Sequence, residues 1–390
     1  MEGDFIKVND WLLPLSWIYG LGVKTRNQLF EIGVLKSRSF DVPVISVGNI
    51  TVGGSGKTPH VEYLIRILKN HCKVAVLSRG YKRKSRGFLL ADKETPMRMI
   101  GDEPFQMKTK FPDVAVAVDS NRCRGIDNLT NDEILKDTDV VLLDDAFQHR
   151  YVKPGINILL VDYHRLIIYD KLLPAGRLRE PKDGKSRADI VIITKCPAEL
   201  KPIEYRVIQK AMDLFPYQDL YFSTLSYENL KPLYCGEEKR LTDISPNDNV
   251  LLLTGIASPK QMMMDLQQYT THITPMTFTD HHQFTARDVK RINQRFANMS
   301  GPKMIITTEK DATRLQGING LSDEVRHNIF QLPVKVEFML GQEEEFNHKI
   351  IDYVSKNSRN SILAKAKDDH KSKDGHRPGN GPRTISFRNN

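Results

Sequence analysis

The chain has few cysteines and lacks a long apolar run. Its four cysteines are scattered over 390 residues without a CxxC pair, which argues against a zinc site or a disulfide framework and favours a reducing compartment. No apolar run approaches the ~18–20 residues that a membrane-spanning helix needs. Glu2 and Asp4 stand where a secretory signal would be basic, so we expect no signal peptide. These absences favour a protein of the cytoplasm.

Positive charge is concentrated at one end of the chain. The net charge is +9, and residues 356–390 hold nine Lys or Arg against three Asp, a net charge of +6. This segment is poor in large apolar residues, so we predict a disordered basic tail. A basic tail can bind RNA or anionic lipid. A solvated extension is the simpler interpretation, and we expect no nucleic-acid partner.

The first forty residues combine aromatic, apolar and basic side chains. Trp11 and Trp17 lie in an apolar stretch that ends near Val23, and Lys24 and Arg26 follow it. Aromatic rings next to cations are typical of a helix that lies in a membrane interface. A helix packed on the body of the protein would explain the same residues, and the residues alone leave both interpretations open.

Short apolar runs recur at spacings that leave room for helices between them. This pattern predicts a P-loop NTPase-like α/β domain with a doubly wound, mostly parallel sheet over residues 41–230. A second alternation of strands and helices predicts a smaller C-terminal α/β domain over residues 231–355, including a last strand at 334–339 and a helix to about 354. The predicted strands of the first domain are 44–47, 74–77, 114–118, 140–143, 156–161 and 190–193.

The most informative segment is the glycine-rich stretch after the first predicted strand. A strand, a glycine-rich turn and Gly-Lys-Thr at a helix start together build a phosphate cradle, as expected for ATP with Mg²⁺. Lys57 would reach the outer phosphates, and the hydroxyl of Thr58 would bind Mg²⁺. The strict pattern has glycine where Thr51 stands. The predicted cradle consists of Thr51, Val52, Gly53, Gly54, Ser55, Gly56, Lys57 and Thr58.

Acidic residues elsewhere could complete such a site. The predicted strand 140–143 leads into Asp144 and Asp145, as a Walker B strand does, so either carboxylate could bind Mg²⁺. Asp102 is a candidate base for an attacking hydroxyl. His281 could pair with a carboxylate or bind metal. Taken alone, Asp102 and His281 could equally be residues of surface turns.

Two loops combine turn-forming residues with arginines. Arg79 and Tyr81 lie in the first loop, and Arg177 and Arg179 lie in the second, within residues 173–181. The planar guanidinium group recognises phosphate through paired hydrogen bonds. These loops therefore suit a phosphorylated substrate or the transferring phosphoryl group, although each arginine could be a solvated charge.

Taken in order, the motifs resemble the tetraacyldisaccharide 4'-kinase family, the lipid A 4'-kinases of Gram-negative bacteria. The resemblance covers about residues 14–354. It implies transfer of the ATP γ-phosphate to the 4'-hydroxyl of an acylated glucosamine disaccharide 1-phosphate, giving lipid IVA in lipid A biosynthesis, at the cytoplasmic face of the inner membrane. The segments that carry it are 47–59, 77–81, 101–104, 143–149, 173–181, 280–281 and 307–311.

The resemblance also implies roles for individual residues. Asp102 would deprotonate or orient the hydroxyl, and His281 would adjust that carboxylate across a cleft. Arg122 is a further candidate for substrate contact, and residues 1–40 would be a helical membrane-docking segment. The phosphates and the metal would be held by Lys57, Thr58, Asp144 and Asp145.

Two departures and several alternatives accompany this interpretation. Ala146 and Lys82 replace glycines that are common in the family. A regulatory P-loop GTPase or a metallochaperone-like NTPase is the main alternative, but the segment 194–197 lacks the aspartate that reads guanine. A kinase for a soluble metabolite would not need Trp11 and Trp17. A nucleic-acid-binding protein would leave the phosphate cradle unexplained.

Overall fold

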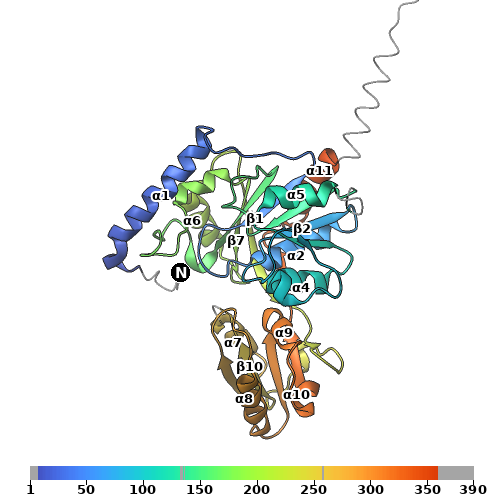
Figure 1. Cartoon of the computed structure of the whole chain (residues 1–390). Helices are drawn as coiled ribbons and strands as arrows, with labels where there is room; N and C mark the ends of the chain where they lie inside the picture. Colours follow the sequence, from blue (N-terminus) through green and yellow to red (C-terminus); the bar gives the residue numbers. More distant parts are fainter. Residues whose placement is uncertain (1–7, 132–134, 136, 257–258, 359–390) are drawn as a thin grey trace, which may run out of the picture.

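The structure, a computed structural model, describes residues 8–131, 135, 137–256 and 259–358, which form two α/β units (Figure 1). The basic tail predicted for residues 356–390 overlaps the end of α11 (Glu343–Asn357), which includes Lys356 and Asn357, and its part from 359 onward lies outside the described residues. The strands of the large unit are β1 Val44–Gly48, β2 Val74–Ser78, β3 Leu89–Leu90, β4 Ala115–Val118, β5 Val140–Asp144, β6 Ile156–Asp162, β7 Ile190–Thr194, β8 Asp219–Tyr227 and β14 Val334–Phe338. Its helices are α1 Leu13–Glu31, α2 Lys57–Leu68, α3 Met97–Ile100, α4 Asp102–Lys110, α5 Arg122–Asn131, α6 Pro202–Met212 and α11 Glu343–Asn357.

The small unit follows the same strand and helix alternation. Its strands are β9 Lys231–Pro232, β10 Asn249–Thr254, β11 Ile273–Thr277, β12 Lys303–Thr308 and β13 Ile329–Leu332. Its helices are α7 Lys260–Leu266, α8 Ala286–Ala297, α9 Glu309–Leu315 and α10 Asp323–Asn328. Short 3-10 helices lie at Asp10–Leu12, Tyr163–Arg165, Lys182–Arg187 and Leu241–Asp243.

The large sheet has β1 near its centre and helices on both faces. Its strand order, among the described residues, is β14-β8-β7-β6-β1-β5-β2-β4-β3, and the pairs between β8 and β4 are parallel. Alternate residues of β1 point to opposite faces of the sheet. Ile45 and Val47 pack with α2 in the hydrophobic core on one face, whereas Val44 packs in the core on the other face. The predicted doubly wound, mostly parallel fold is therefore confirmed. The loop after β1 lies where the chain order reverses, which is where ligands bind in such sheets.

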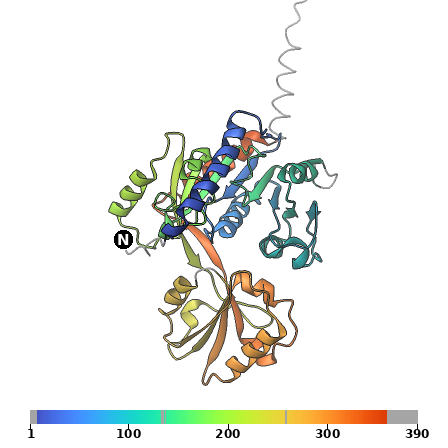
Figure 2. The ribbon, with the colours of Figure 1, turned by 60° about the vertical axis from the view of Figure 1, so that its left-hand side comes forward.

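The end of the chain corrects one prediction. The strand expected at 334–339 and the helix after it were assigned to the small domain of residues 231–355. Instead, β14 pairs antiparallel with β8 in the large sheet. Phe346, Ile350 and Val354 of α11 are buried in the large core beside α2. Apolar pattern alone does not say which sheet a strand joins, because pairing is non-local. In Figure 2, β8 and β14 lie where the chain passes between the large unit and the small unit.

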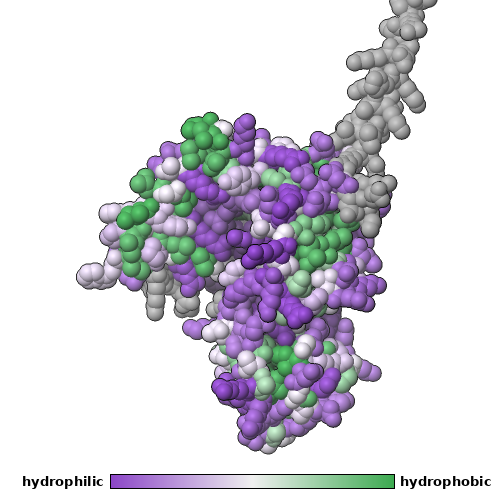
Figure 3. Space-filling model, in the orientation of Figure 1, coloured by the Kyte–Doolittle hydropathy of each residue, from purple (hydrophilic) through white to green (hydrophobic). Residues whose placement is uncertain are grey.

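Helix α1 is both packed and exposed. The hydroxyl of Ser16 donates to Leu172 O at 3.0 Å, and Tyr19 donates to Arg179 O at 2.8 Å, so one side rests on the loop of residues 172–179. Trp11 and Trp17 remain 93% and 73% exposed. The space-filling view shows apolar surface along this helix (Figure 3). Among the described residues, we find no helix that is both long and apolar enough to cross a membrane.

Candidate active site

The phosphate loop is held in shape from behind by polar side chains. Gly53 and Gly56 have φ of +122° and +80°, backbone angles that residues with a Cβ rarely adopt. The amide of Asn49 donates to Ser55 Oγ at 2.8 Å, and Thr194 Oγ1 donates to Ser55 O at 3.0 Å. Lys195 contacts Gly54 O and pairs with an acid of β6. The loop is therefore preorganised to present its backbone N–H groups at the start of α2.

A buried histidine supports the same loop. His60 is one turn into α2, and its Nδ1 donates to Gly56 O at 2.7 Å. Its Nε2 accepts from the Ser223 hydroxyl at 3.0 Å, which joins the loop to β8. Burial lowers the pKa of His60 to about 4, so the ring is neutral near pH 7. The sequence analysis did not predict this role for His60, because nothing distinguishes it there from the other ten of the eleven histidines.

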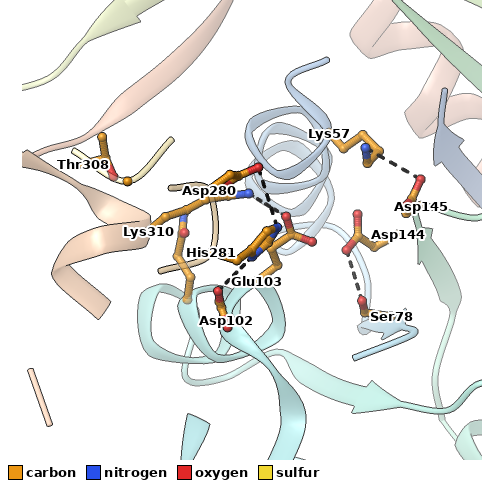
Figure 4. A network of polar contacts seen from close by, with 12 residues as sticks. Lys57, Ser78, Asp102, Glu103, Asp144, Asp145, Asp280, His281, Thr308 and Lys310 are labelled. Atoms are coloured by element: carbon orange, nitrogen blue, oxygen red, sulfur yellow. Dashed lines mark hydrogen bonds and ion pairs between the residues drawn. The ribbon is translucent and has the colours of Figure 1, made fainter. Parts of the chain in front are cut away.

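The two predicted metal carboxylates lie beside the phosphate loop. Strand β5 runs next to β1, with Val47 opposite Asp144, so the ends of both strands meet. Asp144 is fully buried and accepts from Ser78 Oγ at 3.2 Å. Asp145 has a φ of +48° and lies 3.7 Å from Lys57 Nζ. Lys57, Asp144 and Asp145 therefore lie together at the carboxyl ends of β1 and β5 (Figure 4).

These acids fit a divalent cation. The Oδ1 atom of Asp144 is buried and has no hydrogen-bond partner among the described residues. Burial and the charges of Glu103 and Asp145 raise the pKa of Asp144 to about 7. The described residues hold no group of three or more His, Cys, Asp or Glu suited to a metal. Two carboxylates beside a phosphate loop suit Mg²⁺, which is commonly bound by one or two carboxylates plus substrate phosphates and water.

A second carboxylate centre is assembled from both units. Asp102 begins α4 of the large unit, and His281 of the small unit lies with Nδ1 3.1 Å from Asp102 Oδ2. Arg314, from α9, donates to the same oxygen through Nε at 2.9 Å and Nη2 at 2.7 Å. Burial alone would raise the pKa of Asp102, but His281 and Arg314 outweigh it and hold the pKa at about 2. The predicted contact between Asp102 and His281 is therefore present.

Two glycines let the loops around Asp102 approach closely. Gly80 has a φ of +67°, and a Cβ there would lie 2.8 Å from Ile100 O. Gly101 has a φ of +92°, and a Cβ there would lie 2.9 Å from Tyr81 O. This packing brings the Tyr81 ring to 5.2 Å from the His281 ring. Tyr81 thus lies beside the same centre, with its side chain exposed.

Ion pairs formed by residues of α4 also connect the two units, and the sequence analysis did not predict them. Glu103 pairs with Lys310 at 2.6 Å (Figure 4). Lys110, at the end of α4, pairs with Glu62 and with Glu309, each at 2.6 Å. Positions 309 and 310 fall in the segment 307–311, which the family resemblance had singled out without a role. No local pattern could have shown that α9 would face α4.

The predicted substrate arginines occupy different environments. Arg79 and Tyr81 line a basic pocket of about 510 Å³. Arg179 lies 3.7 Å from Asp145, and Arg177 is near Gly53, so this loop covers the phosphate cradle. Arg122 is buried, 2% exposed, and donates to the backbone carbonyl of Asp144 at 3.3 Å. Substrate contact remains a prediction for all of them.

The alanine that departs from the family pattern is readily accommodated. The left-handed residue of this turn is Asp145, whereas Ala146 has no positive φ. The close approach falls on Gly48 instead, where a Cβ would lie 2.7 Å from Phe147 N. The glycine common at position 146 is therefore not required for the backbone here.

The fold and the site together define a P-loop kinase with a second α/β unit. Comparison with known proteins shows which family of such kinases the chain belongs to. The sequence pattern of the tetraacyldisaccharide-1-P 4'-kinase family matches residues 8–355. The chain therefore belongs to this family.

Relatives and a solved structure agree with the family match. A tetraacyldisaccharide 4'-kinase of Phocaeicola vulgatus is 59% identical over 363 residues, 93% of this chain and 99% of the relative. One of Bacteroides thetaiotaomicron is 51% identical over 383 residues, 95% of this chain and all (100%) of the relative. The structure of LpxK from Aquifex aeolicus in complex with ATP matches with a TM-score of 0.66 at 31% identity, over 88% of this chain and 98% of that one. These matches do not favour a regulatory NTPase.

Proposed function

We propose that this chain transfers the γ-phosphoryl group of ATP to the 4'-hydroxyl of a tetraacylated glucosamine disaccharide 1-phosphate, producing lipid IVA for lipid A. The observation that carries the proposal is the pairing of Asp102 with His281 beside a phosphate loop, in a chain of this family. Hydrolysis of ATP alone would not need a carboxylate of one unit that is held by side chains of the other.

Different side chains would bind the phosphates, neutralise charge and accept the proton during phosphoryl transfer. Lys57 and the loop N–H groups hold the phosphates, and Arg179 is placed to neutralise charge that develops during transfer. Thr58, Asp144 and Asp145 would hold Mg²⁺, which would offset the charge of the phosphates. The acceptor oxygen forms a bond to the γ-phosphorus as the bond to ADP breaks. The hydroxyl proton passes to Asp102.

Helix α1 supports a peripheral position at the cytoplasmic face of the inner membrane of a Gram-negative bacterium. Trp11, Trp17 and Leu21 are well exposed, although an apolar side chain of this size gains about 1.5–3 kcal/mol on burial. Trp17 and Leu21 lie on α1, and Trp11 lies in the 3-10 helix directly before it. The exposed Lys24, also on α1, can pair with anionic headgroups. The lipid substrate would then be taken from the surface on which the enzyme rests.

The reaction is tested by transfer of label from γ-labelled ATP with Mg²⁺ in detergent micelles. The acceptor is a tetraacyl disaccharide 1-phosphate, with unacylated glucosamine disaccharide as the control. We expect labelled lipid with the wild type and almost none with Lys57→Ala. Hydrolysis of ATP without labelled lipid would refute the proposed function.

Membrane docking is tested separately by flotation with anionic phospholipid vesicles. The double variant Trp11→Ser, Trp17→Ser should bind at least about tenfold more weakly, because two exposed rings are lost. Met264→Ser, also at an exposed apolar residue but on the small unit, is the matched control. Equal binding of the double variant and the wild type would contradict docking through α1.

A further inference from the structure

Resting on the proposed function, we propose that Arg314 is a positioning residue: it holds one oxygen of Asp102 so that the other oxygen faces the acceptor hydroxyl. Arg314 belongs to the small unit, and Asp102 belongs to the large one. The guanidinium would not touch the substrate, and its effect would pass through the carboxylate.

The contact is made inside the protein. The Arg314 side chain is 0% exposed, and that of Asp102 is 12% exposed. Two nitrogens of the guanidinium donate to Asp102 Oδ2, at 2.9 and 2.7 Å. Charge-assisted hydrogen bonds that are shielded from water are about twice as strong as neutral ones. The position of this oxygen is therefore firmly fixed.

Arg314 is itself held from behind. Its Nη1 donates to Asp311 Oδ1 at 2.9 Å. The other oxygen of Asp311 accepts from Gly255 N at 2.8 Å and from the hydroxyl of Thr308 at 2.7 Å. Thr308 in turn caps the start of α9, because its hydroxyl accepts from Asp311 N. Thr308 and Asp311 of the segment 307–311 thus build a rigid support for this one guanidinium.

The arrangement leaves one carboxylate oxygen available. His281 Nδ1 and both Arg314 donors meet at Asp102 Oδ2, whereas Oδ1 forms no hydrogen bond with any described residue. Rotation of the carboxylate would break all three contacts at once. Oδ1 is therefore the atom that can accept the proton of the hydroxyl, in a fixed orientation.

The charge of Arg314 also has a measurable consequence. Other charged groups near Asp102 include Glu103, which is paired with Lys310, Asp280, which lies 3.9 Å from His281, and Asp311, which is paired with Arg314. Burial opposes ionisation of Asp102, and Arg314 is a main reason why its pKa stays low. Without this guanidinium, burial would be opposed mainly by His281, so the pKa of Asp102 would rise and the carboxylate would be protonated more readily at low pH.

The test compares Arg314→Gln with Arg314→Lys in the full-length protein, using labelled lipid formation. For Arg314→Gln we expect kcat to fall about 10–100-fold with KM for both substrates within a few-fold. Its kcat should also decline more steeply toward low pH than that of the wild type, because protonation of Asp102 is then added to protonation of Asp144. Arg314→Lys keeps the charge but not the fork, so kcat should fall without this steeper decline.

Arg291→Gln is the matched control, because Arg291 lies on α8 of the same unit with a side chain that is 63% exposed. Wild-type kcat and pH profile in Arg314→Gln would overturn the inference, as would a loss of nucleotide affinity equal to the loss of kcat. If Arg314→Gln does not fold, the Lys variant decides, and a wild-type kcat for it overturns the inference. Failure of the wild type to label lipid would instead refute the proposed function.

Discussion

The two sides of the active site are built in different ways. The phosphate side, with Lys57, Asp144 and Asp145, comes entirely from the large unit, where adjacent parallel strands end together. The acceptor side takes Asp102 from the large unit and His281 and Arg314 from the small one. Nucleotide binding should therefore survive changes in the small unit, whereas phosphoryl transfer should depend on how the two units meet.

The largest loss of activity is expected from a substitution on the phosphate side of the active site. Lys57→Ala removes the charge that reaches the outer phosphates and leaves Asp145 without this partner, so kcat/KM should fall by about 10³–10⁴. Nucleotide affinity should weaken as well, which is measured by titration with a fluorescent ATP analogue. Lys69→Ala, at the exposed end of the same helix, should behave as the wild type. Normal ATP binding by the Lys57 variant would contradict this division of roles.

Asp102→Asn should separate the two sides. The amide keeps the shape but cannot take a proton, so kcat should fall by about 10²–10⁴ while ATP affinity stays within a few-fold. Steady-state kinetics and ATP titration of one preparation supply both numbers. A decrease in kcat of less than a few-fold would remove Asp102 from the role of base.

Lys310→Gln should show how far the ion pairs between the units matter. Lys310 bonds to Glu103 at 2.6 Å, and losing a charge-assisted bond costs about 1.5–3 kcal/mol, so kcat should fall by at least about tenfold. Adding Glu103→Gln to this variant should cost less than the two single changes predict when summed. Full additivity would mean that the pair does not couple the units.

His60→Asn should have the smallest effect on turnover, because Asn can still donate to Gly56 O. It should instead change the pH dependence of stability. The folded pKa of about 4 lies below the unfolded value of 6.5, so the unfolded state binds the proton first as pH falls, and stability is lost between these values. The loss approaches about 3 kcal/mol near pH 4. Urea unfolding at pH 7.5 and pH 4.5 should show a flatter dependence for the variant, and an unchanged slope would contradict a neutral His60.

The sequence predicted what is local and missed what is long-range. The phosphate loop and the acidic strand end follow from spacing within short segments, and β1 and β5 are where they were expected. No strand was predicted at the position of β8, and β14 was assigned to the wrong sheet. Arg314 gave no sign in the sequence, because its role depends on how α9 meets α4. The partnership of Asp102 and His281 came from the family resemblance, since neither residue is distinctive alone.

The return of the chain to the large sheet has a consequence for synthesis on the ribosome. Residues 228–333 lie between two strands that pair with each other, with Tyr227 directly opposite Val334. The small unit is therefore complete before the large one, whose last strand and helix are translated last. Until then β8 would present an open edge to other nascent chains. A released chain that is truncated after residue 333 should keep a protease-resistant small unit beside an unfinished large one.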